Sequence, residues 1–117
     1  MKPVRVLLSP EARETLTRLK QEASRHKTAK SIVGSIQKKI DLIKANPHYG
    51  QGIPKDRIPL PFKQKYGITN LFRVELSAYW RLLYTLTDSE TKTEIIAFIL
   101  DFTDHPAYDK LFGYKKK

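Results

Sequence analysis

The chain of 117 residues contains no cysteine, and this absence excludes both a disulfide framework and a thiolate metal site. Nothing in the sequence therefore points to an oxidising compartment. Apolar runs are also short, and none approaches the roughly 20 residues that a membrane-spanning helix requires. The N-terminus, MKPVRVLL, has a basic start but too short an apolar run for a signal peptide. We expect a soluble cytoplasmic protein without a membrane partner.

Acidic residues are scarce relative to basic ones. The chain has 12 Asp and Glu against 22 Lys and Arg, which gives a net charge of +10 and an isoelectric point near 9.9. A small domain with this charge repels itself and attracts polyanions. We expect nucleic acid or the ribosome as a partner, and an acidic protein partner fits the same charge. A basic surface that serves solubility alone is the plain alternative.

The remaining composition is typical of a globular protein. Hydrophobic residues make up 40% of the chain and charged residues 29%, which is unlike a disordered sequence. The length suffices for one modest hydrophobic core and is too short for two. We expect a single domain that spans residues 1–117.

The first 45 residues predict a strand followed by two helices. Residues 3–8 alternate between apolar and polar side chains, as a short strand does. Ser9 and Pro10 form a helix start, and the helix is expected over residues 10–24. A second apolar stripe at three- and four-residue spacing predicts a helix over residues 28–45, which Asn46 and Pro47 end. The short linker favours an antiparallel pair of helices.

Residues 46–69 predict a long and basic loop. This stretch is rich in proline and glycine and shows little periodicity, although a short strand over residues 62–66 is compatible with it. Loops of this length in compact domains are often functional. Four basic side chains in it are expected to bind RNA phosphates: Lys55, Arg57, Lys63 and Lys65.

Three further strands are predicted over residues 70–76, 79–87 and 93–101. A three-residue loop after the first of them places Glu75 opposite Arg81. Arg73 and Arg81 then project from the face of the sheet that the helices leave open, because a guanidinium in the core is costly. In the plainest interpretation, Glu75 and Arg81 form only a cross-strand ion pair. The expected core residues are Phe72, Val74, Trp80, Leu82, Ile36 and Ile40.

These elements together predict an α+β fold. Two N-terminal helices pack on one face of a twisted four-stranded sheet, and charged side chains occupy the other face. The C-terminal segment DHPAYDKLFGYKKK is expected to form a short polar helix or turn with a basic tail. His105 and Tyr108 therefore follow the last strand at the charged face.

Two stretches of the sequence carry a resemblance to a known family. YWRLLYTLTD (79–88) and IIAFILDFTDHPAYDKLFGY (95–114), in the order strand, helix, helix and three strands, resemble the RelE/ParE superfamily of bacterial and archaeal toxins. The nearest branch is the RelE-type mRNA interferases. The resemblance implies a RelE-like fold and a toxin of a type II toxin–antitoxin system, with a cognate antitoxin, the ribosome and mRNA as partners. It also implies mRNA cleavage by attack of a 2′-hydroxyl, without a metal or a small-molecule cofactor.

The resemblance carries over to individual residues. Arg81 matches the strand arginine that stabilises the transition state, and Arg73 falls close to a strand Lys or Arg. His105 and Tyr108 resemble the C-terminal acid–base pair, and an ordinary imidazole titrates at about pH 6.5. Glu75 stands near the place of a second strand lysine of RelE. We therefore expect His105 to be the general base and hold Glu75 in reserve.

Two departures from the family pattern keep other functions open. The first is Glu75, near the place of a lysine in RelE. The second concerns a branch of the superfamily that takes a glutamate from the loop before the arginine strand, because residues 50–70 contain no glutamate. The chain is alternatively a ParE-like toxin that binds DNA gyrase without nuclease chemistry, or a catalytically degenerate basic RNA-binding module. In a purely structural interpretation, His105 caps the last turn and Tyr108 packs on the sheet edge with Phe112.

Overall fold

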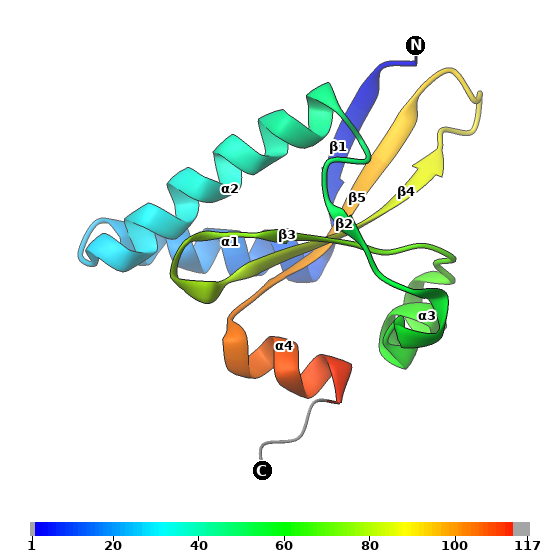
Figure 1. The fold of residues 1–117 in the computed structure, drawn as a ribbon. Helices are drawn as coiled ribbons and strands as arrows, with labels where there is room; N and C mark the ends of the chain where they lie inside the picture. The colour runs from blue at the N-terminus through cyan, green and yellow to red at the C-terminus, as the bar shows by residue number, and fades with distance from the viewer. Residues whose placement is uncertain (1, 114–117) are drawn as a thin grey trace.

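The computed structural model describes residues 2–113 and shows an α+β fold built on one five-stranded sheet (Figure 1). The strands are β1 (Val4–Leu8), β2 (Gln51–Gly52), β3 (Phe72–Glu75), β4 (Arg81–Asp88) and β5 (Ile95–Thr103). The helices are α1 (Pro10–Ala23), α2 (Lys27–Ala45), α3 (Leu60–Tyr66) and α4 (His105–Phe112), with 3₁₀ turns η1 (Lys55–Arg57) and η2 (Ser77–Tyr79). The expected basic tail, residues 115–117, lies outside the described residues.

The sheet has the strand order β1-β5-β4-β3-β2, with β1 parallel to β5 and every other pair antiparallel. The α+β class is confirmed, whereas the expectation of four strands is corrected by β2. This strand pairs only Gln51 with Arg73 and Gly52 with Phe72. A two-residue strand has no alternation to detect, and it lies in the glycine- and proline-rich stretch, so its sequence carries no strand signal.

Helices α1 and α2 form close to their expected bounds. Ser9 accepts a hydrogen bond from the Ala12 amide (3.0 Å) and so caps α1, while Pro10 occupies the first turn. The same hydroxyl donates to the Leu100 carbonyl at 2.6 Å. Because this serine is fully buried, it fixes the start of α1 against β5 as well as capping the helix.

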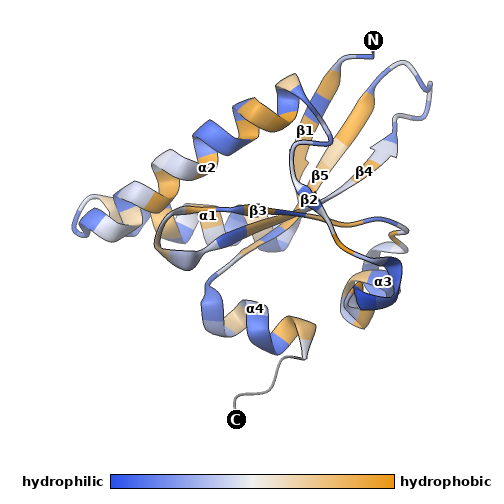
Figure 2. Ribbon diagram, in the orientation of Figure 1, coloured by the Kyte–Doolittle hydropathy of each residue, from blue (hydrophilic) through white to orange (hydrophobic). Residues whose placement is uncertain are grey.

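The main hydrophobic core lies between these two helices and one face of the sheet. Among the expected core residues, Ile36, Val74 and Leu82 are buried, and Ile40, Phe72 and Trp80 are partly buried against them. Apolar and charged residues alternate along β3 (Phe72, Arg73, Val74, Glu75), and hydrophobic segments occur in the sheet and in both helices (Figure 2). The core prediction is therefore confirmed for the helical face.

The opposite face of the sheet is not an open charged surface, which corrects the sequence-based expectation. A second hydrophobic cluster covers part of it and contains Ile58, Leu71, Leu83, Leu100 and Tyr108. Helices α3 and α4 lie on this side, across the sheet from α2 (Figure 1). A β-bulge contributes to the cluster, because Leu83 lies opposite Asp101 while Tyr84 lies opposite Ile99, which leaves Leu100 as the extra residue.

Residues 62–66, for which a short strand was considered, lie in helix α3. Pro59 precedes the helix and Pro61 lies in its first turn, while Gly67 ends it in the left-handed conformation (φ 60°). Proline at the start and glycine at the end are helix signals, and they prevail over weak alternation in so short a segment. Within residues 2–113, no helix is long and apolar enough to cross a membrane.

Candidate functional site

The β3–β4 hairpin brings Arg73, Glu75 and Arg81 onto the same face of the sheet. Its register pairs Val74 with Leu82 and Glu75 with Arg81, as the three-residue loop predicted. Ala78 and Tyr79 in this loop have positive φ angles of 58° and 63°. A left-handed conformation costs a non-glycine residue about 1–2 kcal/mol. The turn thus holds strain, and in this conformation the Tyr79 carbonyl accepts a hydrogen bond from Arg81 Nη1 at 2.8 Å.

Glu75 bridges the two arginines. Its Oε1 lies 3.4 Å from Arg73 Nε and its Oε2 lies 3.6 Å from Arg81 Nε. The expected pair of Glu75 with Arg81 is therefore present, and Arg73 joins it. The carboxylate side chain is 59% exposed, whereas the Arg81 side chain is only 14% exposed. An acidic group thus lies over two largely covered cations.

Arg81 is the most enclosed cation of the group. Its guanidinium lies 4.6 Å from the centre of the Tyr108 ring, and its Nη1 lies 3.3 Å from His105 Nδ1. Its Nε is buried, and among the described residues no group lies within hydrogen-bond distance of it. A buried donor without a hydrogen bond costs about 1–3 kcal/mol. Arg81 therefore retains capacity for an anion that approaches more closely than Glu75 does.

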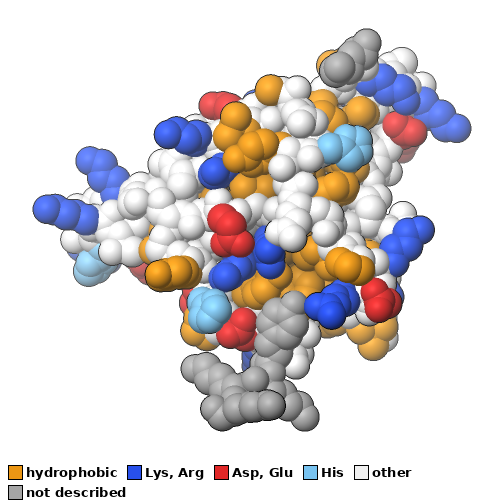
Figure 3. Space-filling view, viewed as in Figure 1, with side chains coloured by type: hydrophobic (Ala, Val, Ile, Leu, Met, Phe, Trp, Pro, Cys, Tyr) orange, Lys and Arg blue, Asp and Glu red, His pale blue; other side chains and the backbone are white. Residues whose placement is uncertain are grey.

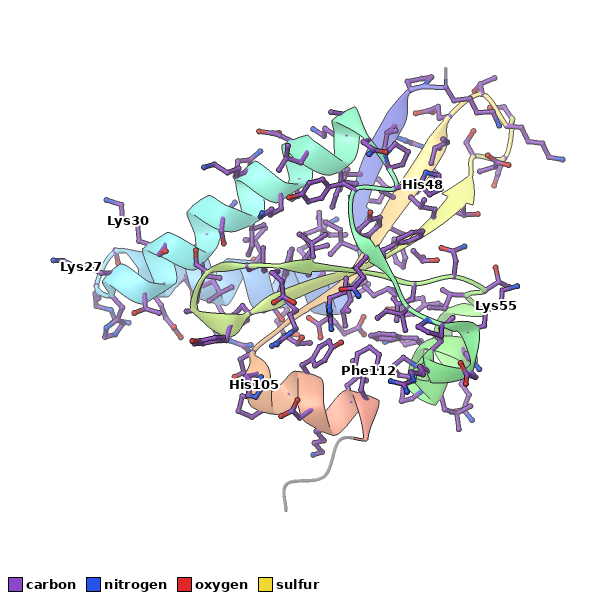
Figure 4. All side chains as sticks on the ribbon, viewed as in Figure 1. Lys27, Lys30, His48, Lys55, His105 and Phe112 are labelled. Atoms are coloured by element: carbon purple, nitrogen blue, oxygen red, sulfur yellow. The ribbon has the colours of Figure 1, made fainter. Side chains whose placement is uncertain are left out.

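Helix α4 supplies His105 and Tyr108. Asp104 caps this helix by accepting a hydrogen bond from the Ala107 amide at 2.9 Å, and His105 is the first helical residue. The interpretation of His105 as a cap of the last turn is therefore wrong. The His105 side chain is 55% exposed, and its Nε2 lies 3.3 Å from Asp109 Oδ2. His105 is labelled at the start of α4 in Figure 4.

Tyr108 packs against both arginines from α4. Its hydroxyl accepts a hydrogen bond from Arg73 Nη1 at 2.9 Å, and its ring stacks with Phe112 at a centroid separation of 4.4 Å. Tyr108 is only 3% exposed, so the ring offers no free face for a nucleobase. The expected packing with Phe112 is confirmed, and the ring also supports both cations.

The four basic residues expected to bind RNA divide between two places. Arg57 lines a pocket of about 120 Å³ together with Arg73 and Tyr108, next to the cluster. Lys65 on α3 pairs instead with Glu11 of α1. Lys63, also on α3, and Lys55 in η1 are exposed, and Figure 4 shows Lys55 beside α3, apart from His105. Only Arg57 thus lies at the edge of the cluster.

The ion pair of Lys65 with Glu11 joins α3 to α1. The Tyr66 hydroxyl donates a second hydrogen bond to the same carboxylate. The hydrogen bond from Lys65, followed by that from Tyr66, lowers the pKa of Glu11 from 4.5 to about 2. Lys65 is therefore occupied by a structural partner in the free protein.

Two residues of the cluster were missed by the sequence analysis. Gln51 on β2 accepts a hydrogen bond from Arg73 Nη2. No sequence signal identifies it, because β2 itself has none. Asp109 contacts His105 from the next turn of α4. The sequence did indicate this contact, because Asp109 follows His105 by four residues and residues four apart share one face of a helix.

We define the arginine cluster as Gln51, Arg73, Glu75, Arg81, His105, Tyr108 and Asp109. Basic, acidic and histidine side chains gather on this face of the molecule (Figure 3). The cluster unites two cations, a carboxylate between them, and an imidazole in contact with one cation. Such a set can bind a phosphate and exchange a proton beside it. Within residues 2–113, no group of three or more His, Cys, Asp or Glu is placed to hold a metal ion.

Comparison of the chain with models of protein families gives no match, and comparisons with curated proteins and with solved structures give none either.

Proposed function

We propose that this protein is a toxin of a type II toxin–antitoxin system, a ribosome-dependent mRNA endonuclease of the RelE type. The observation that supports this most directly is the arginine cluster. The resemblance to RelE toxins selects Arg73, Arg81, His105 and Tyr108, and a continuous chain of contacts links these four side chains although up to 35 residues of sequence separate them. A RelE-like fold and a cytoplasmic location are part of the same proposal.

The phosphate to be cleaved binds between the two arginines. Glu75 now bridges their Nε atoms at 3.4 and 3.6 Å, so a phosphate with its own oxygens at this position displaces the carboxylate. Both guanidiniums present several donors, and the Arg81 Nε gains a hydrogen bond that it lacks in the free protein. Charge that develops on the phosphorane oxygens is then stabilised by two preorganised cations.

His105 acts as the general base of this reaction. It takes the proton of the 2′-hydroxyl, the 2′ oxygen forms a bond to phosphorus, and the bond from phosphorus to the 5′ oxygen breaks. The products are a 2′,3′-cyclic phosphate and a 5′-hydroxyl, whose proton comes from the imidazolium or from water. Glu75 is the weaker candidate for the base, because its carboxylate is held between two arginines. This reaction uses no metal or small-molecule cofactor.

The ribosome supplies what the cluster lacks. The His105 side chain is 55% exposed, so the protein alone does not enclose the reacting groups. Orientation of the reacting groups accounts for a large part of such a barrier. We therefore expect cleavage of mRNA on translating ribosomes and little cleavage of free RNA. The net charge of +10 suits the ribosome, and it equally suits an antitoxin with an acidic segment that covers the cluster.

The deciding experiment is induction of the protein in cells, followed by growth measurement and primer extension on abundant mRNAs. Wild type should stop growth and produce cuts within translated codons. Arg81→Ala should lower the cleavage rate roughly 10²-fold or more, as loss of one preorganised charge stabiliser does. Arg5→Ala is the matched control, because Arg5 also pairs with a carboxylate, Glu94 at 3.4 Å, but lies on β1.

Two outcomes would contradict the proposal. Intact mRNA together with stalled replication and broken chromosomes would favour a ParE-like toxin that binds gyrase. Binding of RNA without any cut, and without an effect of Arg81→Ala on growth, would favour a degenerate RNA-binding module.

A further inference from the structure

The two ring nitrogens of His105 contact groups of opposite kinds. Asp109 lies one helical turn further along α4, and its Oδ2 is 3.3 Å from Nε2. On the other side of the ring, Nδ1 is 3.3 Å from Arg81 Nη1. Charged groups therefore face His105 from two elements, Asp109 from α4 and Arg81 from β4, while Glu75 of β3 reaches it only through Arg81.

These contacts determine where the ring proton lies. A guanidinium has donors and no acceptor, so in the hydrogen bond with Arg81 the Nδ1 atom must be the acceptor. A neutral imidazole with a lone pair on Nδ1 carries its proton on Nε2. The Asp109 carboxylate accepts hydrogen bonds only, and it is placed to accept this proton. The basic nitrogen of His105 therefore faces the arginines.

We propose that Asp109 is the positioning residue of His105 in the proposed cleavage of RNA, on which this inference rests. When the phosphate binds, the Arg81 guanidinium turns its donor from Nδ1 to a phosphate oxygen, while the bond of Nε2 to Asp109 keeps the ring in place. The freed lone pair of Nδ1 then receives the proton of the 2′-hydroxyl as the 2′ oxygen attacks phosphorus and the 5′ oxygen leaves. The imidazolium that forms lies beside the Arg81 guanidinium, and the negative charge of Asp109 offsets this repulsion. Asp109 acts through His105 and contacts no reacting atom.

A purely helix-stabilising role explains the pair less well. In α4 the histidine precedes the aspartate, so a protonated His105 would lie at the positive end of the helix dipole and Asp109 in its C-terminal half. This order is the less favourable one for a pair four residues apart. The start of α4 is also already capped by Asp104. The pair is thus poorly arranged to support the helix and well arranged to orient the imidazole.

The test compares Asp109→Ala with Asp109→Glu and with Asp104→Ala. The last variant removes the cap of α4 and keeps both members of the contact between Asp109 and His105. The first readout is the tautomer of His105 in the protein alone, measured by two-bond ¹H–¹⁵N correlation at a pH where the ring is neutral. The second is kcat and KM for cleavage of ribosome-bound mRNA.

In wild type and in Asp104→Ala, His105 should carry its proton on Nε2. Without Asp109 the half-exposed ring can turn away from Arg81, so Asp109→Ala should populate both tautomers. The same change should lower kcat about tenfold with an unchanged KM, which is a part of the roughly 10²- to 10⁴-fold that general acid–base catalysis contributes. Asp109→Glu should restore most of the rate, and Asp104→Ala should cleave at close to the wild-type rate.

An Nδ1–H tautomer in wild type would overturn the inference without any variant. An unchanged tautomer in Asp109→Ala, or an equal loss of kcat in Asp104→Ala, would also overturn it. If wild type cuts no mRNA on ribosomes, the proposed function fails, while the spectra still decide whether Asp109 orients His105.

Discussion

Replacement of Glu75 by glutamine tests whether a phosphate binds where the carboxylate now lies. Glu75→Gln keeps the size of the side chain and removes the charge that bridges Arg73 and Arg81. If RNA binds as proposed, its phosphate must break both ion pairs in the wild type before it reaches the guanidiniums. We therefore expect the variant to bind single-stranded RNA more tightly.

The size of the expected gain in RNA affinity follows from the exposure of Glu75. Glu75 is 59% exposed, so each ion pair is screened by solvent and is worth about 0.2–1 kcal/mol. Two pairs give roughly 0.4–2 kcal/mol, which corresponds to a Kd lower by about two- to thirtyfold. One additional neutralised phosphate also steepens the dependence of log Kd on log salt by about 0.7.

The assay is fluorescence anisotropy with a labelled RNA 12-mer at several salt concentrations. The control is Glu94→Gln, which removes the same charge from a pair with Arg5 that has the same 3.4 Å separation. If Glu75→Gln binds no more tightly than Glu94→Gln, the phosphate does not bind between the arginines. If Glu75→Gln binds more tightly but no longer cleaves, Glu75 rather than His105 is the base.

Two further predictions concern stability. Glu11→Gln should destabilise the protein at pH 7. The difference in unfolding free energy from wild type should shrink as pH falls from about 4.5 to about 2, because the bonds to Glu11 that lower its pKa stabilise the fold only while the carboxylate is charged. Urea unfolding at several pH values measures this difference, and a difference independent of pH would contradict the prediction. Tyr84→Phe should cost about 1–3 kcal/mol of unfolding free energy at neutral pH, because the buried hydroxyl donates to the Pro47 carbonyl (2.7 Å) and accepts from the Gly50 amide (3.0 Å). A change in thermal unfolding no larger than that of an exposed Tyr79→Phe control would refute this account.

The sequence predicted those features that depend on neighbouring residues. The face of Arg73 and Arg81 followed from alternation along two strands and from the length of one loop, and the register of Glu75 with Arg81 is as predicted. The start of α1 followed from its cap, and α2 followed from its apolar stripe. Such features are set within a few residues of the chain, where pattern and structure coincide.

Features that depend on distant packing were missed. Leu83 shares its face of β4 with Arg81 and Thr85, and these polar neighbours concealed that the apolar side chain of Leu83 must be covered by other residues. The cover comes from Leu71, Leu100 and Tyr108, and the bulge that admits Leu100 has no local sequence signal. The contact of Gln51 with Arg73 depends in turn on β2, which exists only because β3 is beside it.

The parallel pairing of β1 with β5 determines when the cluster can assemble. Val4 pairs with Ile95, so the first strand finds its partner only after 91 further residues (95 − 4) have been made. Contacts this distant along the chain close large loops and form late in folding. His105 and Asp109 lie beyond β5, on α4. A nascent chain that has emerged only through β4 thus holds both arginines but neither a closed sheet nor the imidazole, and it lacks the site that the proposed cleavage requires.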